Sequence, residues 1–391
     1  MVAAQASMSC RVVHLTSVHY PFDTRIFHKE CRTLVSVGYD VTLIAPRAEG
    51  NTVQDGIKLV AVRPPRNRQE RLTRTLFHVY RAALREDADI YHFHDPELMP
   101  IGLMLKLLGK KVIYDVHEDY AGTLDAKRWI PVALRGPAAL GLQVSELSLA
   151  AFYDRIIAVT PKIAAKFRPD KTRLVQNFPW TQELGSVTGM PYEMREPLVV
   201  YVGNIADARG LLEMRRAVEM ASQHAPIKLA IAGKLRSGAQ ADFYGDGANG
   251  LVEYLGPLTR PAVAALLARA RVGIVVLHPT GNYIDSQPTK LFEYMSAGLP
   301  VVASDFFGWR QVVGSVGCGL LVDPLNPSAI ADALRWLLSH PEEAAEMGRK
   351  GQRAVLEQYN WEGEAKSLIA TYNELQSRKP ASQSTRAVAT S

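Results

Sequence analysis

The feature that most constrains this chain is an alternation of short apolar runs with helical patterns, which occurs twice. Apolar runs of strand length begin with RVVHLTS at residues 11–17 and recur as far as TRLVQNF at 172–178. The alternation lapses over a Pro- and Gly-rich segment and restarts with LVVYVGN at 198–204. Such alternation is typical of parallel sheets whose strands are joined by crossover helices. The sequence therefore predicts an α/β protein with two Rossmann-like parallel-sheet domains that face a cleft, followed by C-terminal helices.

The lapse in the pattern also predicts the domain boundaries, because 391 residues are too many for one ordinary domain. The tail SRKPASQSTRAVATS has almost no large apolar residue, which favours disorder. We expect an N-terminal domain at 1–180, a linker at 181–197, a second domain at 198–360, a helix at 361–377 that packs back towards the first domain, and a disordered tail at 378–391.

Composition excludes several classes of protein. The three cysteines, Cys10, Cys31 and Cys318, show no paired spacing, which favours a reducing compartment. No apolar run reaches the roughly 18 residues of a membrane span, and the first ten residues lack the pattern of a signal peptide. We therefore expect a cytoplasmic protein, and we also consider a peripheral position on the inner face of the plasma membrane.

Open parallel sheets bind ligands beyond the carboxyl ends of their strands, so functional residues should follow strands. Neither sheet begins with Gly-x-Gly-x-x-Gly after its first strand, and no Walker loop is present, which excludes a nicotinamide enzyme and a P-loop enzyme. Asp87 and Asp89 form an acid pair, but they precede a strand and so lie at the wrong end of the sheet. We expect no metal site there.

The segment VGNIADARG follows the first strand of the second sheet. Gly203 permits a tight turn, and Arg209 stands before Gly210 at the mouth of the next helix. A guanidinium beside free helix N–H groups suits a phosphate. Lys234, after the strand IKLAIAG, is a second cation at the same edge. The alternative is that Arg209 is a solvated arginine in a surface loop.

A second candidate site lies in DSQPTKLFEYMSAGLPVVASD, which begins at Asp285. Pro288 suits a first helical turn, so the backbone N–H groups of Thr289 and Lys290 are expected to face an anion. Glu293 follows among apolar residues, where a carboxylate is costly unless it is paired. Sugar hydroxyls on either side of a bound phosphate would satisfy the two carboxylates. The alternative is a structural pair between Glu293 and Lys290.

A carboxylate, seven residues and a Glu, followed by YMSAGLPVVASD, resemble the signature of retaining glycosyltransferases of family 4, which have the GT-B fold. The likeness extends from about Arg11 to Ser377. It includes HYPFDTRIF, HFHDPELMPIG, DVHEDY and YVGN followed by Arg-Gly. The order of these motifs, and their positions after strands, make the resemblance specific.

The resemblance implies a nucleotide-sugar donor of the UDP or GDP type, bound mainly by the second domain, and no other cofactor. Glu293 would hold ribose hydroxyls, and Asp285 takes the position of the usual first Glu near the donor sugar. The implied donor-binding residues are Gly203, Asn204, Arg209, Lys234, Pro288, Thr289, Lys290 and Glu293. The implied catalytic residues are His117, Arg209 and Asp285.

Some positions depart from the family pattern. Asp285 is one methylene shorter than Glu, and Arg209 replaces the usual Lys before Gly. Asn204 stands where an Arg commonly contacts phosphate, so we consider Lys234 as its replacement. On the acceptor side the resemblance implies Asp23, Arg25, Glu118 and Asp119, with a structural ion pair between Asp23 and Arg25 as the alternative.

The resemblance, together with these residues, implies a retaining hexosyltransferase-type enzyme that transfers sugar to a glycan or lipid-diphosphate-linked glycan in bacterial-type polysaccharide or glycolipid assembly. Fixed cations and helix amides can stabilise a departing diphosphate, so no metal is expected to be required. A sugar-nucleotide epimerase on the same fold is one alternative. A non-catalytic nucleotide-sugar-binding module, marked by Asp285 and Asn204, is another. No nucleic-acid partner is expected.

Charge is distributed unevenly along the chain. Residues 1–190 contain 25 Lys and Arg against 19 Asp and Glu, which accounts for the whole net charge of +6. Seven arginines fall between Arg63 and Arg85, interleaved with a predicted apolar helical face. A second basic and aromatic patch is AKRWIPVALRG, residues 126–136. We expect an anionic membrane surface as a partner. The alternative is that the apolar face packs on its own sheet. The face consists of Leu72, Leu76, Val79 and Tyr80, and the patch includes Lys127, Arg128, Trp129, Ile130, Leu134 and Arg135.

Overall fold

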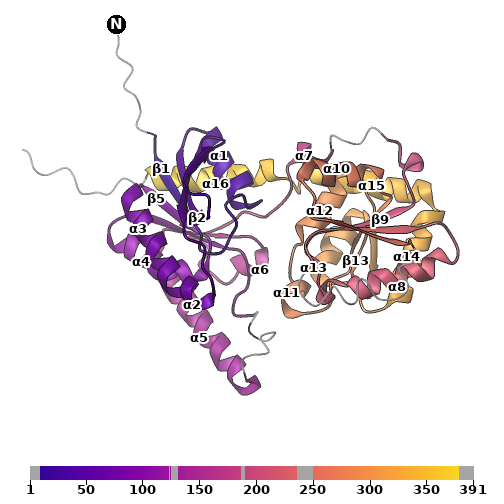
Figure 1. Cartoon of the computed structure of the whole chain (residues 1–391), viewed down its shortest axis with the longest axis horizontal. Coiled ribbons are helices and arrows are strands. Elements are labelled where there is room, and N and C mark those ends of the chain that lie inside the picture. The colour runs from indigo at the N-terminus through magenta and orange to yellow at the C-terminus, as the bar shows by residue number, and fades with distance from the viewer. Residues whose placement is uncertain (1–8, 123, 125–130, 186–189, 236–249, 378–391) are drawn as a thin grey trace, which may run out of the picture. The chain divides into compact units, whose positions relative to one another are not determined.

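The computed structural model describes residues 9–122, 124, 131–185, 190–235 and 250–377 (Figure 1). The chain divides into two compact units. Unit 1 comprises residues 1–121, 131–176 and 364–391, and unit 2 comprises residues 122–130 and 177–363. Each unit contains one β-sheet with helices on its faces. The predicted α/β class with two parallel-sheet domains is confirmed.

The sheet of unit 1 has eight strands in the order β3-β4-β2-β1-β5-β6-β7-β8. All neighbours are parallel except β3, an edge strand that pairs antiparallel with β4 and that the apolar pattern did not predict. The strands are β1 (Arg11–Leu15), β2 (Asp40–Pro46), β3 (Thr52–Gln54), β4 (Ile57–Val62), β5 (Ile90–Phe93), β6 (Lys111–Val116), β7 (Arg155–Ala158) and β8 (Thr172–Leu174).

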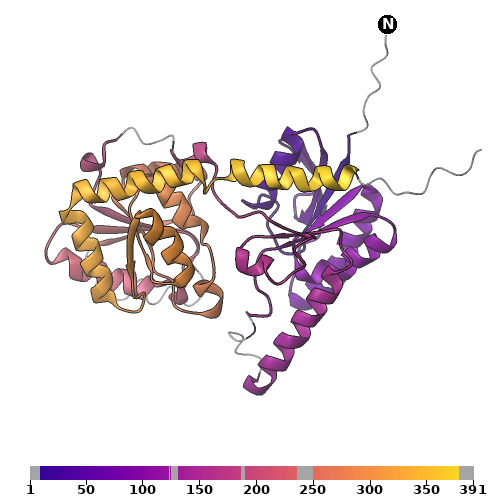
Figure 2. The ribbon, with the colours of Figure 1, turned by 180° about the vertical axis from the view of Figure 1, so that it is seen from behind.

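Helices cover both faces of this sheet. One face packs on α3, α4, α5 and α6. The last helix of the chain, α16, lies along the sheet in Figure 2, where Tyr372 and Glu374 contact strands β5 and β7. The helices are η1 (Ile26–Cys31), α1 (Arg32–Ser36), α2 (Arg68–Glu70), η2 (Arg71–Thr75), α3 (Leu76–Glu86), η3 (Pro96–Leu98), α4 (Met99–Leu107), α5 (Val132–Ala150), α6 (Pro161–Ala164) and α16 (Trp361–Ser377).

The two faces of the unit 1 sheet differ in chemistry. Side chains alternate along a strand, so Val13 and Leu15 of β1 enter the apolar core on one face while His14 points to the other. His92 of β5 and Asp115 of β6 follow the same alternation. Parallel sheets are usually apolar on both faces. Unit 1 instead buries polar side chains from three adjacent strands on one face.

The sheet of unit 2 has six parallel strands in the order β11-β10-β9-β12-β13-β14. Its two faces are both apolar: α10 and α12 pack on one, and α8 and α14 on the other. The strands are β9 (Leu198–Val202), β10 (Lys228–Ala232), β11 (Val252–Gly256), β12 (Val272–Val275), β13 (Val301–Ser304) and β14 (Gly319–Val322). The helices are α7 (Thr181–Gly185), η5 (Tyr192–Met194), η6 (Asp207–Arg209), α8 (Leu211–Ser222), α10 (Arg260–Arg269), α11 (Gly281–Ile284), α12 (Thr289–Ser296), α13 (Phe307–Trp309), η7 (Arg310–Gly314), α14 (Pro327–Ser339) and α15 (Pro341–Glu357).

The segment predicted as a linker, 181–197, belongs to unit 2 and is partly folded. It carries α7 and η5, and buried Tyr192 donates its hydroxyl hydrogen to the carbonyl of Arg271 at 3.0 Å. Residues 364–377 of α16 belong to unit 1. The predicted disordered tail at 378–391 and Lys127, Arg128, Trp129 and Ile130 lie outside the described residues.

Candidate functional site

The turn after β9 brings a glycine against a buried lysine. Gly203 has a φ of +137°, a conformation that side chains with a Cβ rarely adopt. A Cβ at this position would lie 2.8 Å from the Nζ atom of Lys290, which comes from the first turn of α12. The tight turn predicted for Gly203 is therefore also what makes room for the ammonium group.

Lys290 is 8% exposed, and its Nζ lies 3.6 Å from the centroid of the Tyr201 ring. Among the described residues, no acceptor forms a hydrogen bond with Nζ. Burial, together with the nearby charge of Arg209, lowers the pKa of Lys290 well below its usual value, while Glu293 opposes this shift. A buried cation without an acceptor is costly, so this group suits an anionic ligand.

Arg209 is the second cation of the same region. It ends the short helix η6, and Gly210, with a φ of +76°, starts α8 directly after it. The guanidinium lies 5.6 Å from the centroid of the Tyr283 ring. The charge of Arg209 contributes to the lowered pKa of Lys290. Unit 2 thus gathers two cations at the carboxyl end of β9, as the sequence predicted for Arg209.

The start of α12 adds backbone donors to these cations. Pro288 is the N-cap residue, and Thr289 and Lys290 occupy the first turn. The first N–H groups of an α-helix have no intrahelical acceptor, and the N-terminus favours negative charge. The side-chain oxygen of Thr289 accepts a hydrogen bond from Asn177 Nδ2 at 3.3 Å. The arrangement has the donors that a diphosphate requires.

Glu293 is 6% exposed, and its partner was not identified from the sequence. Its Oε1 accepts a hydrogen bond from Arg260 Nη1 at 2.7 Å, and Arg260 Nε also donates to Glu183 at 2.6 Å. The structural pair between Glu293 and Lys290 that we considered is therefore not formed. Arg260 lies on α10, more than thirty positions away, and no local spacing could have indicated it.

The remaining predicted residues of unit 2 lie at its surface. Asp285 is the exposed C-cap residue of α11, and Asn204 is exposed, with its carbonyl accepting from the Tyr201 hydroxyl at 2.9 Å. Lys234 is exposed, and its carbonyl accepts from Ile205 N–H at 2.9 Å. The sequence predicted only a backbone contact for Lys290, and the structure adds its buried side chain to the cations of this unit.

In unit 1, His117 follows β6 and is held by Asp115. His117 Nε2 lies 2.8 Å from Asp115 Oδ2, and with its proton on Nε2 the imidazole donates to that oxygen. Asp115 is fully buried and accepts from Arg25 Nε at 3.0 Å and Nη2 at 3.1 Å. This arrangement fixes the ring of His117. The sequence singled out His117 but not Asp115, although the two are separated by one residue.

Two of the predicted acceptor-side residues, Asp23 and Arg25, lie at the start of η1. Arg25 is 3% exposed, and it pairs with Glu30 and Asp115 rather than with Asp23. Arg25 is therefore buried in unit 1, and its predicted place on the first domain's side of the cleft stays a prediction. Asp23 accepts from the backbone N–H groups of Arg25 and Ile26 at 2.8 and 3.0 Å, which fixes the start of η1.

The other two acceptor-side residues follow His117 directly. Glu118 is exposed. Asp119 is half-buried and forms an ion pair with Lys166 of unit 1. Glu118 is therefore the most exposed of the three predicted acceptor-side carboxylates.

Comparison with known families gives two matches. Residues 24–178 match the family described as Glycosyltransferase Family 4, and residues 191–354 match Glycosyl transferases group 1. An uncharacterized glycosyltransferase of Methanocaldococcus jannaschii is 26% identical over 203 residues, half of each chain. A putative teichuronic acid biosynthesis glycosyltransferase of Bacillus subtilis, TuaC, is 22% identical over 83% of this chain and 88% of its own. The chain thus spans half the length of the archaeal relative.

Solved structures share the fold at low sequence identity. A sucrose-phosphate synthase from Thermosynechococcus elongatus has a TM-score of 0.72 at 18% identity and covers 95% of this chain and 100% of its own. Anabaena HepE in complex with UDP has a TM-score of 0.71 at 13% identity, with coverage of 94% and 100%.

Proposed function

This chain belongs to the glycosyltransferases of the family 4 type, which have the GT-B fold, and from that premise we propose that it transfers a sugar from a nucleoside diphosphate donor to a glycan or lipid-linked glycan with retention of configuration. The observation that carries the proposal is the buried Lys290 ammonium, which has no hydrogen-bond acceptor among the described residues and whose pKa is lowered in part by the charge of Arg209. A diphosphate is the group in such a donor that would complete these contacts.

In this proposal the diphosphate is bound by unit 2. Lys290 and Arg209 neutralise the negative charge that develops as the donor sugar departs, and the N–H groups at Thr289 and Lys290 donate to the phosphate oxygens. Because these groups are fixed before the reaction, they stabilise the leaving group without reorganisation. No metal ion is needed for this step.

The carboxylates of unit 2 bind the two ends of the donor. Glu293 accepts the ribose hydroxyls while Arg260, bonded to its Oε1, holds the carboxylate in position. Asp285 contacts the donor sugar. The acceptor attacks the face that the leaving group vacates, and no covalent nucleophile is assigned. His117, oriented by Asp115, contacts the transferring sugar from unit 1.

UDP is the first donor nucleotide to test, because complexes of the Anabaena HepE protein contain UDP and UDP-glucose. For the acceptor, the name of the Bacillus relative, a putative teichuronic acid biosynthesis enzyme, supports a glycan in polysaccharide assembly. We propose a lipid-diphosphate-linked form of that glycan, reached by a protein that lies in the cytoplasm at the membrane surface.

The membrane part of the proposal is supported by a different face of unit 1 from the one predicted. Leu76, Val79 and Tyr80 pack into the apolar core, so they are not available for a membrane. The exposed side of the same region carries Arg74, Phe77, Arg81 and Leu84, at spacings of three, four and three. None of the described helices is long and apolar enough to cross a membrane.

A panel of UDP, GDP, ADP and their sugars tests donor binding by thermal shift. We expect one nucleotide series to raise the melting temperature by several degrees, since a ligand at a hundred times its Kd stabilises by about 2.7 kcal/mol. Release of nucleotide that depends on an added glycan acceptor then separates a transferase from an epimerase, which would turn over without one. Absence of a shift with every nucleotide would refute the donor site.

A further inference from the structure

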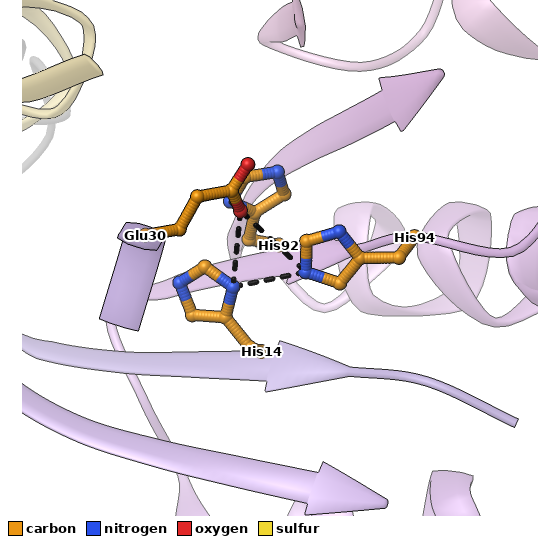
Figure 3. A group of neighbouring side chains, drawn as sticks. All are labelled: His14, Glu30, His92 and His94. Atoms are coloured by element: carbon orange, nitrogen blue, oxygen red, sulfur yellow. Dashed lines mark hydrogen bonds and ion pairs between the residues drawn. The ribbon is translucent and has the colours of Figure 1, made fainter. Parts of the chain in front are cut away.

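Four buried side chains of unit 1 converge on one point (Figure 3). His14 and His92 are paired neighbours on the parallel strands β1 and β5, and His94 follows β5. Glu30 reaches the same point from η1, which packs over this face of the sheet. All four side chains are fully buried. The sequence had indicated none of them, because the histidines lie within or just after strands and the glutamate comes from a separate helix.

The distances between their polar atoms match a small coordination site. Glu30 Oε2 lies 3.8 Å from His14 Nδ1, 4.0 Å from His92 Nδ1 and 3.9 Å from His94 Nε2. His14 Nδ1 and His94 Nε2 are 3.0 Å apart. Ligands about 2.1 Å from a tetrahedral ion are separated by about 3.4 Å. The four distances above lie within about 0.6 Å of that separation, and all four atoms lie within 4.8 Å of one another.

Charge and hydrogen bonding leave Glu30 incompletely satisfied. Glu30 and Asp115 are both fully buried, yet Arg25 is the guanidinium that pairs with both. Neither carboxylate oxygen of Glu30 has a well-aligned hydrogen bond among the described residues. Burial holds His14 and His92 in the neutral form by lowering the pKa of each well below its usual value. Burial and the neighbouring Asp115 raise the pKa of Glu30 well above its usual value, so in the free protein a carboxyl group faces the three imidazoles, and a bound cation would favour its ionised form.

The geometry points to a site for one divalent transition-metal ion, bound by His14, Glu30, His92 and His94. Three imidazole nitrogens and one carboxylate oxygen in a tetrahedral arrangement suit Zn²⁺. The ion would link β1, β5 and η1, and its charge would stabilise the ionised form of Glu30 beside the single guanidinium of Arg25. It belongs to unit 1 and is separate from the metal-free binding of diphosphate proposed for unit 2.

Neighbouring groups are positioned as outer partners of such a ligand set. Asp115 Oδ2 lies 3.1 Å from His94 Nδ1, so a proton on Nδ1 of His94 leaves its Nε2 free to bind the metal. The Tyr372 hydroxyl lies 3.2 Å from His14 Nε2, so a proton on Nε2 of His14 leaves its Nδ1 free in the same way. Tyr372 also lies 2.8 Å from His92 Nδ1, a contact that metal binding at Nδ1 would replace.

A second group of potential ligands shares one member with this cluster. It consists of His94, Asp115 and His117. In that group Asp115 is already satisfied by Arg25 and His117. We therefore assign the ion to the cluster that contains Glu30.

The test is metal analysis of the whole chain, produced in zinc-supplemented medium and purified without metal-affinity resin. We expect about one equivalent of zinc to remain after dialysis against a weak chelator. Protein grown with Co²⁺ instead should show the visible absorption of four-coordinate cobalt. Absence of bound metal in both preparations would overturn the proposal.

Variants locate the ion. Glu30→Gln and His14→Gln should each lose the metal and the cobalt absorption, whereas Glu146→Gln should keep both. Glu146 is the matched control because it is also buried in unit 1 but bonds to Tyr114, outside the cluster. Circular dichroism establishes that each variant is folded. Metal retained by folded Glu30→Gln and His14→Gln protein would place it at exposed histidines and refute the site. If both variants fail to fold, the wild-type stoichiometry and cobalt spectrum decide the question.

Discussion

The two units differ in how the buried charged side chains near the carboxyl ends of their strands are paired. In unit 1, the buried side chains of Arg25 and Asp115 form a hydrogen-bonded ion pair, and Asp115 also holds the ring of His117. In unit 2, Glu293 is paired with Arg260, but Lys290 has no hydrogen-bond acceptor among the described residues. The first arrangement holds a side chain in place, and the second requires a ligand. Charge pairing therefore distinguishes a supporting network from a binding site more clearly than charge alone.

The largest expected effect follows from removing the groups that would bind the donor. Arg209→Ala and Glu293→Ala should each lower kcat/KM by roughly a hundredfold or more, because losing stabilisation of the leaving group costs about 3 kcal/mol. Lys228→Ala, an exposed lysine on β10 of the same sheet, is the control and should change the rate less than threefold. Near-normal rates in both Arg209→Ala and Glu293→Ala, measured on folded protein, would contradict the assignment of the donor site.

The next largest effect is on the stability of unit 1. Arg25→Met leaves Glu30 and Asp115 without their guanidinium, which should lower the free energy of unfolding by about 3 kcal/mol or more. Arg168→Met removes an exposed pair with Asp170 and should cost less than about 1 kcal/mol. Denaturant unfolding of both variants measures the difference. Equal losses would show that the buried network contributes no more than a surface ion pair.

Most of the fold could be predicted from the sequence because buried parallel strands produce continuous apolar runs. The predicted runs became the strands of both sheets other than β3. Strand β3 was missed because it is short and half-exposed at a sheet edge. Local motifs were enough to place Arg209 after β9 and Lys290 in the first turn of a helix. Long-range partners could not be predicted, since neither the Arg260 that pairs with Glu293 nor the Glu30 that faces His14 shares a local spacing with its partner.

The third prediction tests whether the buried charge of Lys290 lowers the free energy of unfolding of the protein without its ligand. Lys290→Met keeps the length of the side chain without the charge, so it should raise the free energy of unfolding by about 1 kcal/mol at neutral pH while abolishing the thermal shift with nucleotide. The pKa of Lys290 is lower in the folded state than in the unfolded state, so unfolded protein binds more protons between these two values.

The free energy of unfolding of the wild type should therefore rise with pH between the folded pKa of Lys290 and its unfolded pKa near 10. The difference in free energy of unfolding between Lys290→Met and the wild type should shrink over the same pH range. Urea unfolding at a series of pH values measures this. A variant that is less stable than wild type at every pH would show that the contact with Tyr201 outweighs the cost of burying the charge.

A smaller effect is expected from the exposed face of η2 and α3. The double variant Arg74→Ala and Arg81→Ala should weaken binding to vesicles that contain anionic lipid, because each basic residue near such a surface contributes on the order of 1 kcal/mol. Lys350→Ala with Arg353→Ala, on the exposed side of α15 in unit 2, is the matched control. Co-sedimentation at low and high salt is the measurement. If the wild-type protein sediments with neither anionic nor neutral vesicles, a soluble acceptor is favoured.

The smallest expected effect is that of brief exposure to a chelator. Arg209 and Lys290 are covalent parts of unit 2, so the initial rate of transfer should be unchanged when excess chelator is added at the start of the assay. A metal ion in the cluster of unit 1 would be fully buried and would leave slowly, so it should not alter this result. Prolonged chelation tests the cluster separately. Loss of activity within seconds that magnesium or manganese restores would show that the diphosphate needs a metal, whereas slow loss restored by zinc alone, with a lower melting temperature, would assign the effect to unit 1.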